Sequence, residues 1–82
     1  MFKVIWENKA RAELAELSYP LKILDKVELY LAQKPIELGK PLKGEYKSLY
    51  RYRFGNYRVI YSVSIEKSTV TAIKIGHRAN IY

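Results

Sequence analysis

Three arginines surround a predicted tight turn in the middle of the chain. Residues 49–58 read LYRYRFGNYR, so two aromatic-rich runs flank Gly55-Asn56. A two-residue connection with glycine first is typical of a type II′ β-hairpin. In that register Arg53 lies directly opposite Arg58, and the alternation of side chains along a strand puts Arg51 on the same face. The segment therefore predicts a hairpin with one arginine-rich face.

The predicted arginine cluster favours an anionic ligand. Like charges placed opposite each other destabilise an antiparallel pair, and Arg53 facing Arg58 is such a pair. A guanidinium group presents a planar fork of donors that fits phosphate oxygens, so phosphate is the natural ligand. The alternative is a solvated strand face whose arginines extend into water or pair with Glu45 and Glu66.

The other face of the hairpin is predicted to be core. It is aromatic and β-branched, which suits packing against helices better than stacking on a nucleic-acid base. The residues on this face are Tyr50, Tyr52, Phe54, Tyr57, Val59 and Tyr61.

The composition limits the chain to one small domain, over residues 1–82, with a basic surface. Its 15 lysines and arginines against 8 acidic residues give a net charge of +7, which predicts attraction to nucleic acid or to an acidic protein. There is no cysteine and a single histidine, so we expect no disulfide, no metal site and no cofactor. Neither a signal peptide nor a membrane-binding helix is visible, which predicts a cytoplasmic protein.

The N-terminal third is predicted to form a strand and the first of two helices. Residues 2–6 read as a strand, and Ile5 on its outward side indicates burial on both faces, as in a central strand. Asn8 is the predicted N-cap of a helix over residues 9–17.

A second helix is predicted to begin at Pro20 and to end before Pro35, because a residue that precedes proline is pushed out of the α region. At most one helical turn follows, over residues 35–38. The apolar stripe that would pack this helix on the sheet is Leu21, Leu24, Val27 and Leu31, widened by Ile23 and Tyr30.

The last predicted strand covers residues 69–75, and its register decides which residues join the arginines. A turn centred near residue 65 or 66 places Lys74 opposite Arg58. His77, Arg78 and Tyr82 then lie beside the arginine cluster. The expected fold is α+β: an N-terminal strand, a two-helix hairpin and a three-stranded antiparallel meander, giving a mixed four-stranded sheet with both helices on one face.

This order of elements resembles the RelE/ParE superfamily of bacterial and archaeal toxins over essentially the whole chain. The chain ending is similar to the RelE branch, whose members are ribosome-dependent endoribonucleases that cut messenger RNA in the ribosomal A site. The ParE branch poisons DNA gyrase. The segments that carry the resemblance are Pro41-Leu42-Lys43-Gly44, residues 49–53, residues 57–61 and Ile75-Gly76-His77-Arg78 through Tyr82.

The resemblance also implies site residues. Two basic residues of the second family strand match Arg51 and Arg53, the arginine opening the next strand matches Arg58, and the terminal pair matches Arg78 and Tyr82. The implied roles are base, phosphate stabilisation, leaving-group acid and stacking on a base. The family commonly has lysine at the first two positions, and arginine cannot accept a proton as lysine can.

The implied chemistry is metal-independent, because the RNA 2′-hydroxyl attacks its own adjacent phosphate and the protein has to align it and neutralise charge. We hypothesise that His77 gives or takes the proton, since its ordinary pKa suits that role. A strand-end histidine bonded to backbone or solvent is the alternative, as a frayed end is for Tyr82.

The partners that the resemblance implies are a cognate antitoxin that docks between sheet and helices, the ribosome and messenger RNA. Two other function classes stay open. One is a ParE-like inhibitor of DNA gyrase, and the other is a cleavage-inactive relative that only binds its antitoxin.

Overall fold

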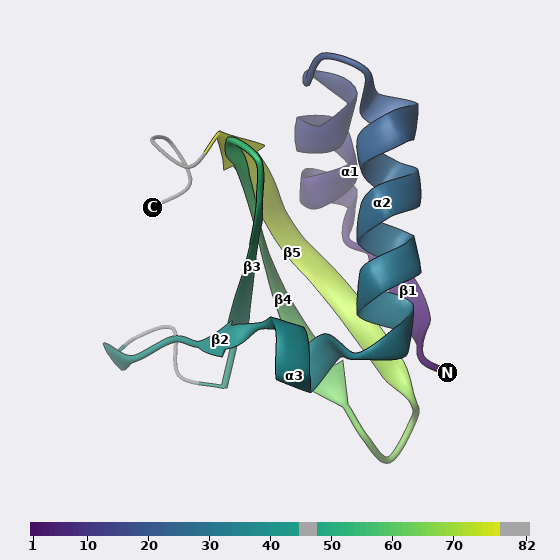
Figure 1. Ribbon diagram of the computed structural model, residues 1–82, viewed down its shortest axis with the longest axis vertical. Helices are drawn as coiled ribbons and strands as arrows, with labels where there is room; N and C mark the ends of the chain where they lie inside the picture. The colour runs from purple at the N-terminus through teal and green to yellow at the C-terminus, as the bar shows by residue number, and fades with distance from the viewer. Residues whose placement is uncertain (45–47, 78–82) are drawn as a thin grey trace.

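The computed structural model describes residues 1–44 and 48–77, so Arg78 and Tyr82 lie outside the described residues. It is an α+β fold in which helices pack on a mixed β-sheet (Figure 1), as predicted. The elements are β1 (Lys3–Trp6), α1 (Asn8–Ala15), α2 (Pro20–Gln33), α3 (Pro35–Leu38), β2 (Lys40–Pro41), β3 (Tyr50–Phe54), β4 (Tyr57–Ser64) and β5 (Thr69–His77).

The sheet has five strands in the order β1-β5-β4-β3-β2. Strand β1 runs parallel to β5, and the other neighbours are antiparallel. The prediction of four strands missed β2, which consists of only Lys40 and Pro41. The prediction that β1 is central was wrong: β1 is an edge strand and the Ile5 side chain is 42% exposed. One outward isoleucine does not distinguish a covered strand from an edge strand.

The β3–β4 hairpin has the predicted register. Arg53 pairs with Arg58, and all five pairs from Tyr50 to Phe54 match the prediction. Gly55 has a φ of 55°, and Asn56 is not among the residues with positive φ. That combination is the one a type II′ turn requires.

The β4–β5 pairing differs from the prediction by two residues. Arg58 lies opposite Gly76, whereas Lys74 lies opposite Ile60. The predicted pair of Arg58 with Lys74 was therefore wrong. One residue of this difference comes from a bulge between Ile60 and the next residue of β4, where β5 has one extra residue. The other comes from the turn, which pairs Ser64 with Thr69.

One hydrophobic core lies between the helices and one face of the sheet. Helix α1 contributes Ala10 and Leu14, and α2 contributes a buried stripe at helical spacing. The hairpin aromatics pack, partly buried, around the core residues that the sheet contributes: Trp6, Val59, Tyr61, Val70, Ala72 and Ile75. The aromatic face of the hairpin is thus core, as predicted.

The ends of the helices differ in detail from the prediction. Asn8 is the first helical residue of α1, and Glu7 occupies the N-cap position without a side-chain cap. Leu21 is 74% exposed and does not belong to the core stripe, in which Ile23 takes its place. The single turn predicted over residues 35–38 is confirmed as α3.

Polar contacts attach the helices to the sheet. The Glu13 Oε1 atom accepts a hydrogen bond of 3.1 Å from the backbone N–H of Ile75, on the part of β5 that extends beyond β1. The Trp6 indole donates to Glu28 Oε2 at 3.2 Å. In residues 1–44 and 48–77, no helix combines the length and the apolar character that crossing a bilayer demands.

Candidate nucleic-acid interface

The face of the sheet turned away from the core is lined by cations from four strands. Antiparallel partners share a face, so the paired residues Lys40 and Arg51 point to the same side, and the Arg53–Arg58 pair joins them one pleat further along. We call this surface the basic face. It consists of Lys40 on β2, Arg51 and Arg53 on β3, Arg58 on β4 and Lys74 on β5.

The cations form two rows across the strands. One row runs through Lys40, Arg51 and Lys74, with the buried Ile60 between the last two. The other contains Arg53 and Arg58, followed by Gly76. The rows are two residues apart along a strand, which corresponds to about 7 Å.

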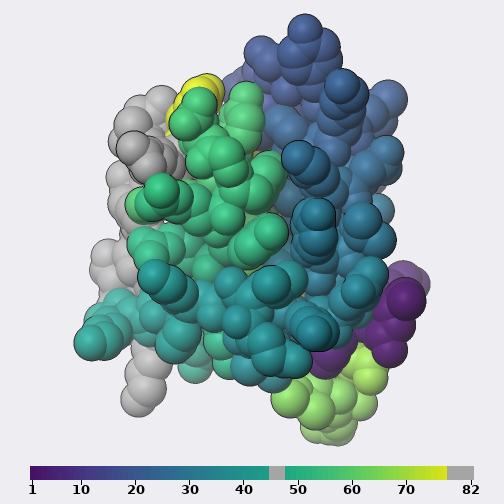
Figure 2. Space-filling view, in the orientation of Figure 1, coloured from purple at the N-terminus to yellow at the C-terminus, as the bar shows by residue number. Residues whose placement is uncertain are grey.

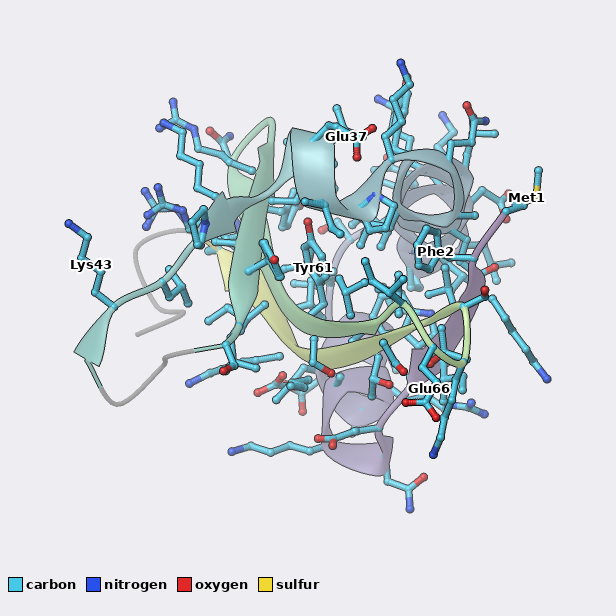
Figure 3. The ribbon with its side chains drawn as sticks, turned by 90° about the horizontal axis from the view of Figure 1, so that it is seen from below. Met1, Phe2, Glu37, Lys43, Tyr61 and Glu66 are labelled. Carbon is cyan, nitrogen blue, oxygen red and sulfur yellow. The ribbon has the colours of Figure 1, made fainter. Side chains whose placement is uncertain are left out.

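Negative charge is scarce on this surface. Within the residues that the structure describes, none of the five strands contains an aspartate or a glutamate. Glu66 lies in the turn after β4, at the end of that strand opposite to Arg58, so it does not pair with Arg53 or Arg58 (Figures 1 and 3). Glu45, the other predicted partner, lies outside the described residues. Side by side, these cations fit a ligand with repeated negative charge.

The arginines differ in exposure. Arg53 is exposed, whereas Arg51 and Arg58 are partly buried. The Nε atom of Arg58 is shielded from solvent. A guanidinium group that is partly buried loses less rotamer freedom when it binds an anion, so Arg58 is the more preorganised member of the pair.

A pocket of about 270 Å³ opens at the β2 end of the basic face. It is lined by Leu38, Lys40, Arg51, Tyr52 and Arg53. Sequence reasoning found the two arginines but missed Lys40, because residues 36–47 read as a connection and a two-residue strand leaves no periodic signal. Side chains that end in nitrogen gather beside β2 and β3, on the side away from Tyr61 (Figure 3).

His77 does not join the arginine cluster, contrary to the prediction. It pairs with Tyr57, and the two rings have centroids 4.9 Å apart and planes inclined by 45°. Tyr57 belongs to the helix-facing side of the sheet, so the His77 ring lies on the face opposite to Arg58. The bulge in the β4–β5 pairing changes which residues of β5 face the core. The predicted site residues Arg78 and Tyr82 are outside the described residues.

A second, larger hollow lies on the helix side. Its volume is about 550 Å³, and it separates the first turns of α2 from the end of the β3–β4 hairpin. Figure 2 shows the hairpin end beside α2 on this face. The lining residues are Ser18, Tyr19, Lys22, Ile23, Asp25, Lys26, Phe54, Gly55 and Tyr57.

Comparison with known proteins decides the family. Residues 4–82 match the family model of the ParE toxin of the type II toxin-antitoxin system parDE. The toxin RelG of Mycobacterium tuberculosis is 34% identical over 85 aligned positions, which cover 99% of this chain and 95% of RelG. The chain belongs to the RelE/ParE superfamily of toxins. The resemblance stated from the sequence is thereby confirmed.

Solved structures of the superfamily share the fold of this RelE/ParE toxin. A chain of the toxin–antitoxin complex RelBE2 from Mycobacterium tuberculosis superposes with a TM-score of 0.86 at 28% identity, covering 94% of this chain and 98% of that one. A chain of the intact Escherichia coli RelBE complex gives a TM-score of 0.75 at 26% identity, over 94% and 96% of the two chains.

Proposed function

We propose that this toxin is a ribosome-dependent endoribonuclease that cleaves messenger RNA in the ribosomal A site without a metal ion. The observation that carries the proposal is the Arg53–Arg58 pair, in which two arginines lie directly opposite each other on adjacent strands and share one face of the sheet. Relatives named RelG and RelE support the endoribonuclease branch of the superfamily.

In the proposed reaction the substrate supplies its own nucleophile. The 2′-oxygen forms a bond to the adjacent phosphorus while the bond from phosphorus to the 5′-oxygen breaks. The 2′-hydroxyl loses its proton and the leaving oxygen gains one, so the products carry a 2′,3′-cyclic phosphate and a 5′-hydroxyl. Charge grows on the phosphate oxygens in the transition state, and Arg53 and Arg58 stabilise it.

Proton transfer is assigned to residues outside the described part of the chain. Arg78 protonates the leaving oxygen in this proposal, and Tyr82 stacks on an RNA base, as the resemblance implies. His77 is left out, because its ring packs on Tyr57 on the other face of the sheet. Arg51 and Arg53 contribute charge and hydrogen bonds, since arginine does not accept a proton.

The test is primer extension on a messenger RNA in a translating extract. We expect the parent protein to cut within codons only when ribosomes are present, and we expect Arg58→Ala to cut about 10²- to 10³-fold more slowly. Arg11→Ala, which removes one exposed arginine from α1, is the matched control and is expected to cut like the parent. Absence of ribosome-dependent cuts by the parent would refute the proposal.

A gyrase inhibitor is the second candidate, and the match to a ParE family model favours it. Such a toxin binds protein rather than cleaving RNA. A DNA supercoiling assay separates the two: inhibition of gyrase by both the parent and Arg58→Ala, with translation undisturbed, would support this candidate instead.

We further propose that an acidic cognate antitoxin neutralises the toxin in the cytoplasm. Two of the similar solved structures, RelBE2 from Mycobacterium tuberculosis and the Escherichia coli RelBE complex, are toxin–antitoxin complexes. The net charge of +7 suits an acidic partner. The hollow between α2 and the hairpin offers Ile23, Phe54 and Tyr57 to an apolar side chain of that partner, with Lys22 and Lys26 at its rim.

A further inference from the structure

The pocket at the β2 end of the basic face adds a lysine to the arginine cluster. Lys40 is directly opposite Arg51, and both line the 270 Å³ pocket together with Arg53 and Leu38. The pair thus places two positively charged side chains next to each other at the pocket, where both can contact one anionic group. The pocket is below the roughly 300 Å³ at which small-molecule sites begin, so it takes one small unit of a larger ligand.

The backbone that carries Lys40 is fixed from beneath. The Tyr61 side chain is fully buried, and its hydroxyl donates a hydrogen bond of 2.6 Å to the Pro35 carbonyl oxygen at the start of α3. Figure 3 shows Tyr61 beneath α3. Gly39 lies so close over this ring that a Cβ atom would overlap the Tyr61 hydroxyl. Lys40 follows directly, and its strand pairing with Arg51 completes the attachment.

The spacing of the two cation rows resembles that of a nucleic-acid backbone. The rows are about 7 Å apart, because they are separated by two residues of an extended strand. Successive phosphates of an extended single strand have a similar spacing. When one phosphate binds at Arg53 and Arg58, the next phosphates lie on either side of it along the RNA. The direction in which the RNA runs decides which of them comes close to Lys40 and Arg51.

We propose that Lys40 and Arg51 bind the phosphate next to the scissile one, as a subsite for single-stranded RNA that the protein reads through charge alone. This inference rests on the proposed function, which places the scissile phosphate at Arg53 and Arg58. The subsite holds the RNA strand in line along β3, and Leu38 forms the apolar wall against the sugar that joins the two phosphates.

The test measures equilibrium binding by fluorescence anisotropy. The probe is a short single-stranded RNA with one 2′-deoxy position at the cut, so that it is not cleaved. We expect Lys40→Ala to bind it several-fold more weakly and to lower the slope of log affinity against log salt by about 0.7, the loss of one phosphate contact. Lys40→Arg is expected to restore both. Lys9→Ala, an exposed lysine of α1, is the matched control.

A neutral methylphosphonate, moved one linkage at a time, identifies the phosphate. At the flanking linkage this substitution is expected to weaken RNA binding by the parent protein and to cause no further loss of affinity in Lys40→Ala. Additive losses at every linkage, or a salt slope of Lys40→Ala equal to that of Lys9→Ala, would overturn the subsite. If the parent binds no RNA and Lys40→Ala instead weakens an acidic antitoxin peptide, the surface belongs to the partner and the subsite is refuted.

Failure of the subsite and failure of the proposed function give different results. Ribosome-dependent cuts by the parent together with an unchanged salt slope for Lys40→Ala would refute the subsite alone. Absence of cuts together with Lys40-dependent binding at one linkage would refute cleavage and leave an RNA-binding surface.

Discussion

Arginine occupies positions 51 and 53, and a guanidinium group offers a planar fork of hydrogen-bond donors but no acceptor for a proton. Many relatives have lysine at these positions, as the resemblance implies, and a lysine there is able to lose its proton. In the proposed reaction Arg51 and Arg53 therefore act through charge and donor geometry. Lysines are nevertheless present on the same surface, because β2 and β5 contribute Lys40 and Lys74 from either side.

Tyr61 makes the stability of the fold sensitive to alkaline pH. Burial, with smaller effects from Tyr50 and Tyr52, raises the pKa of its hydroxyl far above the ordinary value of 10.0. In the unfolded chain this hydroxyl ionises above pH of about 10, whereas in the folded chain it stays protonated. The unfolded state then binds fewer protons, so the free energy of unfolding falls as pH rises above 10.

We predict that Tyr61→Phe flattens this alkaline decline. The variant loses the hydrogen bond to Pro35, so its free energy of unfolding at neutral pH is expected to be about 1 kcal/mol lower than that of the parent. Between pH 10 and 11, on the other hand, its free energy of unfolding is expected to fall less steeply than that of the parent, by up to about 1.4 kcal/mol per pH unit. Urea unfolding followed by circular dichroism at pH 7, 10 and 11 measures both effects. Parallel declines would contradict the prediction.

At the scale of elements, the hairpin could be predicted because its sequence signal is local. The register of β4 against β5 could not be predicted from such a signal. Gly55-Asn56 encodes the turn within two residues, so the register of β3 and β4 followed. Strict alternation from Val70 and Ala72 on the core side would have put His77 on the basic face. The extra residue of β5 at the bulge reverses this alternation, so Ile75 is buried and His77 lies beside Tyr57. The residue types of β5 contain no signal from which this bulge could be predicted.

The connection from α3 to β2 depends on Gly39, and we predict that Gly39→Ala destabilises the fold by about 1–3 kcal/mol. The added methyl group would overlap the Tyr61 hydroxyl. In a Tyr61→Phe background the same substitution is expected to cost less, because the overlapping atom is absent. A double-mutant cycle measured by urea unfolding gives the coupling. A coupling of zero would mean that α3 moves aside freely.

On the scale of the whole molecule, the net charge of +7 acts at a distance on any acidic partner. We predict that the association rate constant with the proposed acidic antitoxin falls by roughly tenfold or more between low and high salt, whereas the dissociation rate changes less. Stopped-flow mixing at a series of salt concentrations is the measurement. A flat association rate would show that apolar contacts at the hollow beside α2 govern recognition without steering.

Strand β2 ends the sheet in a way that bears on self-association. An exposed sheet edge is a template on which a second copy can add a strand, and this is a route to aggregation. Strand β2 itself consists of Lys40, which carries charge, and Pro41, which has no amide hydrogen to offer. Beside its basic face the sheet of this toxin thus ends in a short strand that is a poor template for a second copy.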